Sequence, residues 1–137
     1  MDSRAKPFID HLAIHSYEFD QEIYNKNDKS KTPHYLLKSK KHPILAISAP
    51  MPFVRFREDL GIKLQKDKME NFLDIINYIN QCADITIFSG DETTIYTLAT
   101  FTGIYDKELF SDFLLLWFRD HSLLKTEYEG VLDSVLI

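Results

Sequence analysis

Two histidines are the first residues in this chain whose types and spacing could support chemistry. His11 and His15 are four positions apart, and on a helix this spacing places two imidazoles on one face, as in a two-histidine metal site. A zinc ion needs at least one more ligand, and the pair lacks the glutamate of a His-Glu-x-x-His motif. We therefore expect two histidines at or near the surface, with no bound metal and no cofactor.

Cys82 is the second candidate, and it is the single cysteine of the chain. A catalytic thiol needs a lowered pKa and a nearby base, and nothing in the spacing links His42 or His121 to this residue. Cys82 follows Ile76 and Ile79 on the apolar side of a predicted helix, which predicts a buried thiol that behaves as a small hydrophobe. The sequence thus contains no catalytic signature, and we expect no enzymatic activity.

Arg55 and Arg57 are the third candidate, because they alternate on a predicted strand and project to the same side as Phe53. A guanidinium group is a two-pronged donor, so the pair could bind a carboxylate or phosphate. Alternatively, the arginines face solvent and pair with acids of the same chain, namely Glu58, Asp59, or Glu18, Asp20 and Glu22 of a neighbouring strand. The sequence favours the second arrangement and leaves anion binding as the alternative.

A long helix predicted between Tyr105 and Tyr128 carries apolar residues almost all the way round it. Its middle, from Phe113 to Phe118, is apolar without interruption. Since successive helical residues point about 100° apart, no single packed stripe can hide all six. Asp106 is placed to cap this helix, and Tyr105 and Phe110 are placed to form a hydrophobic staple.

The side chains of this helix that a sheet would leave uncovered predict an interaction surface. We assign that surface to four residues: Phe110, Leu114, Leu115 and Phe118. Exposed apolar side chains that lie together mark sites of association, so we expect a homodimer interface or a groove for a protein partner. The sequence leaves open whether another chain or the apolar tail at 131–137 buries Leu115 and Phe118.

The elements that must position these residues follow from periodicity and turn chemistry. A short helix begins near Pro7, with Phe8, Ile9, Leu12 and Ile14 as its candidate apolar side. Alternating patterns predict four extended segments, at residues 15–24, 34–39, 44–49 and 53–57. Two prolines precede the last segment, which favours an edge, a bulge or a sheet corner there over a central strand.

A second helix and a hairpin precede the long helix. Asp67 to Glu70 has the spacing of a capping box and opens an amphipathic helix. Residues 85–88 and 93–101 then flank a turn that contains glycine. The order α-β-β-β(-β)-α-β-β-α groups the strands in runs, which predicts an α+β fold with an antiparallel sheet packed with helices. The 137 residues are near the commonest size of one domain, so we expect a single domain over residues 1–137.

Composition narrows the possible partners. The net charge of -5 argues against general binding of nucleic acid, although residues 26–41 hold six lysines against one acid. The polar loop at 25–33 within this region is expected to be a solvated connection. No apolar run is long enough to span a membrane, and the first residues lack the apolar region of a secretion signal, so we expect a cytoplasmic protein.

Three segments in the last half of the chain form a recognisable series: Asn77-Tyr78-Ile79-Asn80 at the end of a helix, Asp84-Ile85-Thr86-Ile87-Phe88, and Gly103-Ile104-Tyr105-Asp106-Lys107 before an aromatic final helix. In these segments the chain resembles the YbjN-type sensory transduction regulator family, whose fold is shared with type III secretion chaperones. The resemblance implies an antiparallel sheet with helices, often a homodimer, that binds other proteins and lacks enzymatic activity. It brings no catalytic residues.

The function we predict is therefore a non-enzymatic protein-binding or regulatory module. The alternative is a small-ligand-binding protein or an enzyme subunit that uses the face of Arg55 and Arg57.

Overall fold

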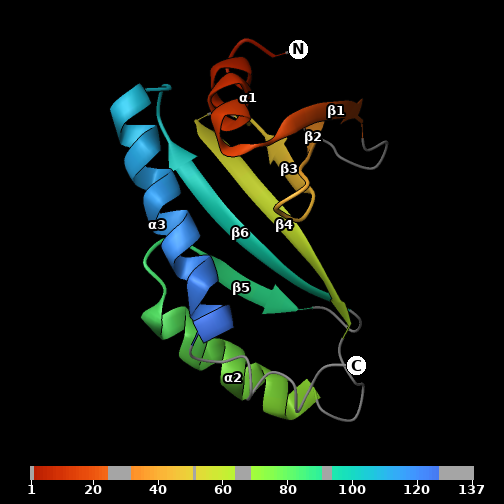
Figure 1. Ribbon diagram of the computed structural model, residues 1–137, viewed down its shortest axis with the longest axis vertical. Helices are drawn as coiled ribbons and strands as arrows, with labels where there is room; N and C mark the ends of the chain where they lie inside the picture. The colour runs from red at the N-terminus through yellow and green to blue at the C-terminus, as the bar shows by residue number, and fades with distance from the viewer. Residues whose placement is uncertain (1, 25–31, 51, 64–68, 91–93, 127–137) are drawn as a thin grey trace.

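The elements of the chain follow the predicted α+β order (Figure 1). The computed structural model describes residues 2–24, 32–50, 52–63, 69–90 and 94–126. Its elements are α1 (Lys6–Leu12), a short 3-10 helix η1 (Ala13–His15), β1 (Glu18–Ile23), β2 (His34–Lys38), β3 (Leu45–Ser48), β4 (Phe53–Lys63), α2 (Met69–Cys82), β5 (Ile87–Gly90), β6 (Thr94–Thr102) and α3 (Lys107–Thr126). The predicted hairpin corresponds to β5 and β6, which pair in antiparallel fashion.

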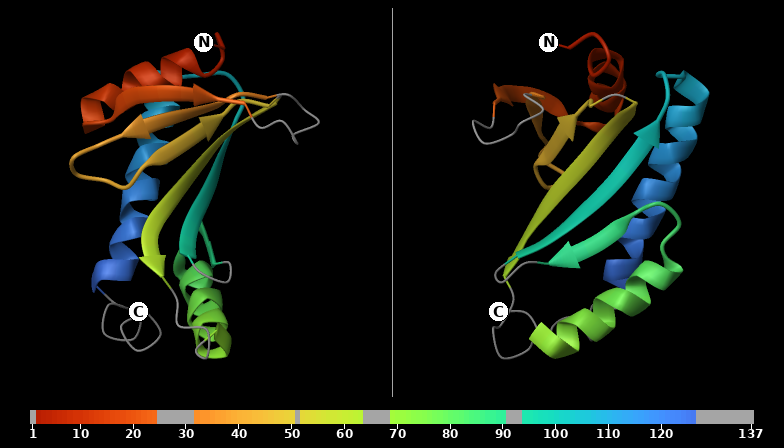
Figure 2. Two further views of the ribbon diagram at one scale, coloured as in Figure 1. Left: turned by 90° about the vertical axis from the view of Figure 1, so that its right-hand side faces the viewer. Right: turned by 180° about the vertical axis from the view of Figure 1, so that it is seen from behind.

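The strands form one six-stranded antiparallel sheet in the order β1-β2-β3-β4-β6-β5. Helices α1 and α3 lie on one face of this sheet, and α2 lies across its end beside β5 (Figure 2). The opposite face of the central strands has no helix over it in the part of the chain that the structure describes (Figure 2).

An aromatic cluster joins α1 and α3 to the covered face. The ring of Phe8 lies 5.2 Å from that of Phe101 and 4.9 Å from that of Phe110, both in edge-to-face geometry. Phe113 lies 5.3 Å from Phe56 of β4. All five rings are buried, and burial of a phenylalanine contributes roughly 1.5–3 kcal/mol, so this cluster fixes both helices on the sheet.

The start of α3 is fixed as the sequence predicts. The Leu109 amide donates to Asp106 Oδ1 at 3.0 Å, which is the expected N-cap. The rings of Tyr105 and Phe110 are 6.1 Å apart, so the predicted staple also forms.

Strand β4 differs from its prediction, because it is a long interior strand between β3 and β6 rather than an edge. Pro50 and Pro52 precede the strand, so neither has to donate within the ladder. Their carbonyls instead accept from the amides of Phe53, at 2.6 Å, and Gly103, at 3.3 Å. The irregular register of β4 lies at its far end, between Asp59 and Lys63.

Two polar side chains hold the segment that leads into β5. Buried Asp120 of α3 accepts the amides of residues 84, 85 and 86 at 2.8, 2.9 and 2.9 Å. Asn80 of α2 pairs with the backbone of Phe88 as a neighbouring strand would, since its Nδ2 donates to the carbonyl at 2.9 Å and its Oδ1 accepts the amide at 2.7 Å. The backbone of this edge strand is therefore fixed by side chains from two helices.

Several predictions at the ends of elements need correction or are not tested. Ile14 is 74% exposed because α1 ends at Leu12, before the fourth apolar position. His15 belongs to η1 and not to a strand, since β1 begins at Glu18. Asp67 of the capping box, most of the polar loop at 25–33 and the tail at 131–137 lie outside the described residues.

Candidate interaction surface

The uncovered face of the sheet carries apolar side chains where an exposed antiparallel face would ordinarily be polar. Alternate residues of the central strands, such as Val54 and Phe56, are buried beneath α1 and α3. The residues between them point to the other side. We call the apolar members of this second set the open face: Leu36, Ala46, Phe53, Ile87, Tyr96 and Leu98.

Strand register aligns part of the open face into one row across the sheet. Ile87 lies opposite Leu98, Leu98 opposite Arg57, Arg57 opposite Ala46, and Ala46 opposite Leu36. Ile87 is 58% exposed, and the other apolar members of the row are partly exposed. Four of the five residues of this row are apolar and in contact with solvent, which is typical of a surface that binds another molecule.

The two arginines lie on this face, as predicted, but their neighbours are aromatic. The guanidinium carbon of Arg57 lies 4.3 Å from the centre of the Tyr96 ring, and that of Arg55 lies 5.7 Å from the ring of Phe53. Within the described residues, neither guanidinium group forms an ion pair with a carboxylate. Cation–π contact occupies the flat side of a guanidinium and leaves its N–H edge able to bind an anion.

The predicted pairing of these arginines with Glu58 and with the acidic strand was wrong. Glu58 follows Phe56 by two positions and therefore points to the covered face, where it is 2% exposed. The acidic strand is β1, and two other strands separate it from β4.

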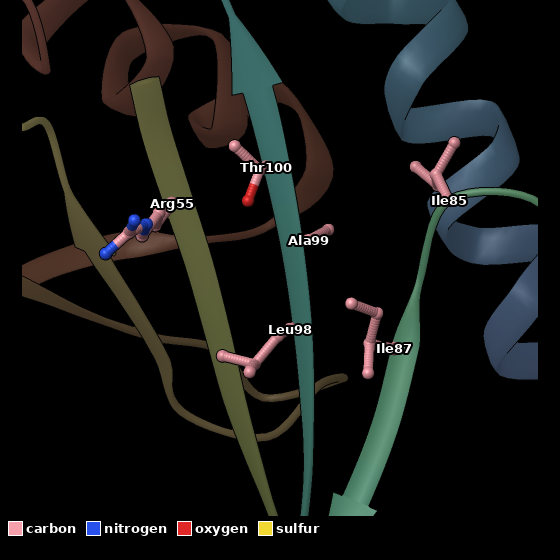
Figure 3. Close-up of a pocket in the computed structure, with 6 residues that line it drawn as sticks. All are labelled: Arg55, Ile85, Ile87, Leu98, Ala99 and Thr100. Atoms are coloured by element: carbon pink, nitrogen blue, oxygen red, sulfur yellow. The ribbon is translucent and has the colours of Figure 1, made fainter. Parts of the chain in front are cut away.

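An open hollow of about 360 Å³ lies beside Arg55 (Figure 3). It is lined by residues of β4, β6, β5 and the segment that enters β5: Arg55, Leu98, Ala99, Thr100, Ile87 and Ile85. In Figure 3 the side chain of Leu98 extends from β6 toward β4, that of Ile87 lies between β6 and β5, and the guanidinium group of Arg55 extends over β4 on the side away from β5. The hollow is therefore walled by apolar side chains and bordered by Arg55, whose guanidinium group points away from it.

The structure does not bring the four residues predicted on α3 onto one surface. Phe110 and Leu114 are buried in the core. Leu115 is 68% exposed. Phe118 is partly buried, with its ring 5.4 Å from His15 and 5.5 Å from His42. Two histidines of the same chain thus cover part of Phe118, and what α3 offers to a partner is Leu115 and the remaining side of Phe118.

His11 and His15 lie side by side, with parallel rings 6.0 Å apart. His11 is buried, and its Nδ1 lies 2.8 Å from the hydroxyl of Tyr105. Burial, followed by the neighbouring His15 and Lys107, lowers the pKa of His11. Within the described residues, no group of three or more His, Cys, Asp or Glu side chains could hold a metal ion.

A polar cluster that the sequence did not predict lies between α3 and the covered face. Glu58 Oε1 is 2.7 Å from His121 Nε2, and the Tyr17 hydroxyl donates to Glu58 Oε2 at 3.5 Å. His121 Nδ1 lies 2.7 Å from the carbonyl of Trp117. Since both ring nitrogens face oxygen acceptors, a doubly protonated imidazolium satisfies both contacts.

The electrostatics of this cluster follow from its burial. Burial lowers the pKa of His121, but hydrogen bonding to Glu58 and its charge outweigh this effect, and the net pKa is raised. Burial and the charge of Glu58 both raise the pKa of Tyr17, which therefore keeps its proton. The result is an inward-facing ion pair that joins α3 to β4.

Cys82 is exposed, contrary to the prediction of a buried thiol. It is the last residue of α2, and the helix ends there, so the apolar side that buries Ile76 and Ile79 does not extend over it.

Sequence reasoning missed the apolar members of the open face, although a signal was present. In β6, apolar residues stand at 95, 96, 98, 99 and 101, so neither side of the strand is polar throughout. The location of Glu58 on the covered face could also have been predicted from the sequence, because Glu58 continues the alternation of Val54 and Phe56.

Comparison with known proteins supports the fold. No protein-family model matches the chain, and no curated protein sequence matches it. Among solved structures, the chain is similar to YbjN from E. coli, a protein with a proposed role as a transcription regulator. The TM-score is 0.64 over 96% of this chain and 94% of that one, at 9% sequence identity. The chain therefore has a YbjN-like α+β fold. Within the described residues, no helix is long and apolar enough to cross a membrane.

Proposed function

We propose that this protein is a non-enzymatic module that binds another protein through the open face of its sheet. The observation that carries the proposal is the row from Ile87 to Leu36, in which four of five residues are apolar and which solvent contacts and no described element covers. An antiparallel sheet that needed only to stay folded would place polar residues there.

A regulatory role is consistent with this activity. YbjN, which shares the fold, has a proposed role as a transcription regulator. The net charge of -5 disfavours direct contact with nucleic acid. A module of this kind would act on a protein partner or on a second copy of itself, and Leu115 on α3 offers a separate apolar contact for either.

A second candidate function is the binding of a small anionic ligand. The hollow beside Arg55 favours it, because an apolar wall and a guanidinium group together suit a small molecule that carries a carboxylate. The volume of about 360 Å³ is at the lower end for ligand sites.

The test compares an open-face variant with a matched control. Ile87→Asp places a charge in the row at a position that is already exposed, so the fold should persist. Ile104→Asp makes the same change at a residue that is 89% exposed and lies outside the open face. Both variants and the wild type are used as bait in affinity purification with quantitative mass spectrometry, and each is sedimented alone.

A protein retained by the wild type and by Ile104→Asp but lost from Ile87→Asp supports the proposal, as does a dimer that only Ile87→Asp dissociates. Identical protein profiles and identical sedimentation for all three would refute it. A metabolite that co-purifies with the wild type and is lost on Arg55→Gln would favour the ligand-binding alternative.

A further inference from the structure

We propose that the partner segment which occupies the open face carries an isolated carboxylate for Arg55 next to aliphatic side chains that fill the hollow. This inference rests on the proposed function and specifies the chemistry of the partner.

The walls of the hollow indicate why the partner segment should carry aliphatic side chains. Ile85, which precedes β5, Ile87 of β5 and Leu98 of β6 line it with branched hydrocarbon (Figure 3). Ile87 is the most exposed residue of the apolar row, so covering it removes the largest apolar area from water. The backbone of this wall is held by Asp120 and Asn80, which means that the partner meets a fixed surface.

The contacts of Arg55 indicate why the partner segment should carry a carboxylate. Its guanidinium group lies over the ring of Phe53 and forms no ion pair within the described residues. Thr100 stands directly opposite Arg55 on β6, and Ser48 stands opposite it on β3. Two hydroxyl groups therefore flank a cation whose N–H edge remains available, which is a suitable environment for a carboxylate.

The net charge of the protein limits how acidic the partner segment can be. At -5, the chain as a whole repels an acidic tract or a polyphosphate backbone. The charge of Arg55 acts only at short range, because salt screens interactions beyond about 8 Å. A single carboxylate between apolar residues avoids the general repulsion and still reaches the guanidinium.

Sheet geometry gives the spacing of these groups in the partner. Ile87 lies on β5 and Arg55 lies on β4, with β6 between the two strands. Neighbouring strands are about 4.8 Å apart, so Ile87 and Arg55 are separated by about 10 Å across the sheet. An extended segment covers that distance in about two to four residues, and side chains two or four positions apart share one face.

The experiment titrates the full-length, isotope-labelled protein with a six-residue peptide and follows amide chemical shifts by NMR. The peptide has leucine at its first and third positions, glutamate at the fifth and serine between them, with both ends blocked so that glutamate is its only charge. A second peptide has glutamine in place of glutamate. Each is titrated into the wild type, Arg55→Gln, Ile87→Ser and two controls outside the open face, Lys6→Gln on α1 and Ile104→Ser.

We expect the glutamate peptide to shift amides of residues 85–87 and 98–100. Arg55→Gln, or the glutamine peptide, should weaken binding about three- to fivefold, the size expected of a partly exposed ion pair, whereas Lys6→Gln should not. Ile87→Ser should weaken the binding of both peptides, and Ile104→Ser should leave it unchanged.

Three results would overturn the inference. Equal affinity for the glutamate and glutamine peptides, with weaker binding of both to Ile87→Ser, would show that the carboxylate is not recognised and would leave the proposed function intact. A dimer in solution that Ile87→Ser dissociates would make the occupant a second copy. Shifts confined to other parts of the molecule would exclude this face, and the affinity purification with Ile87→Asp would then decide the proposed function independently.

Discussion

Replacing Glu58 with glutamine should flatten the dependence of stability on pH above pH 6.5. Glu58 is the buried partner of His121, whose pKa is raised in the folded protein above its ordinary value of 6.5. The folded state therefore binds a proton more tightly than the unfolded state. The stabilisation from this proton is fully present below pH 6.5 and is lost as the pH rises through the raised pKa.

The change in stability with pH has an upper limit, because only one proton is involved. A single group changes the free energy of unfolding by at most about 1.4 kcal/mol per pH unit. Below pH 6.5, Glu58→Gln should also lower stability outright, because an imidazolium would be left without its carboxylate. Removing one member of a buried pair costs roughly 3–5 kcal/mol. We expect about 2 kcal/mol here, since His121 can release its proton and accept a hydrogen bond from the glutamine amide.

The assay is urea denaturation followed by circular dichroism at pH values from 5.5 to 9. The wild type should lose stability above pH 6.5, and Glu58→Gln should show little change over the same range. Glu22→Gln on exposed β1 is the matched control, and it should keep the wild-type profile. A Glu58→Gln profile that falls as steeply as the wild type would refute the reasoning, as would an NMR titration that places the pKa of His121 at or below 6.5.

Four further predictions concern other residues and the metal content of the protein. His11→Gln should reduce the loss of stability between pH 6.5 and 5, since a histidine whose pKa is lowered by folding destabilises the protein as the pH falls through 6.5, and urea denaturation measures it. Asp120→Asn should cost about 2–4 kcal/mol, because an amide cannot accept all three backbone N–H groups, whereas exposed Asp112→Asn should cost less than about 0.5 kcal/mol by thermal melting. Leu115→Glu should leave the melting temperature nearly unchanged, whereas Phe118→Glu should lower stability by about 2 kcal/mol, and sedimentation of Leu115→Glu shows whether α3 also forms an interface. Elemental analysis should find no stoichiometric transition metal, and about one zinc per chain would contradict this.

Local signals in the sequence were enough to predict the elements themselves. The cap at Asp106 and the staple between Tyr105 and Phe110 each join residues at most five positions apart, so they can be predicted without knowledge of the fold. The same holds for the hairpin of β5 and β6, whose paired strands are close together in the sequence.

Contacts between distant parts of the chain could not be predicted in this way. The pairing of β4 with β6 joins residues such as Phe53 and Thr102, and it makes an interior strand of a segment that its prolines predicted to be an edge, a bulge or a sheet corner. The contact between Glu58 and His121 spans 63 positions. Strand order likewise decided which apolar residues met solvent, because the open face exists only once Ile87, Leu98 and Leu36 are aligned.

The two edges of the sheet are finished differently, and this limits how copies of the protein can polymerise. At the β5 edge, the outward amides of Thr86 and Phe88 are already bound by the side chains of Asp120 and Asn80. The β1 edge consists of six exposed residues, and no described strand lies beyond it. Fibre growth by strand addition requires two competent edges on each molecule. With only one, two copies that met through β1 would form a symmetric pair that offers no further edge, so strand addition would stop at the dimer.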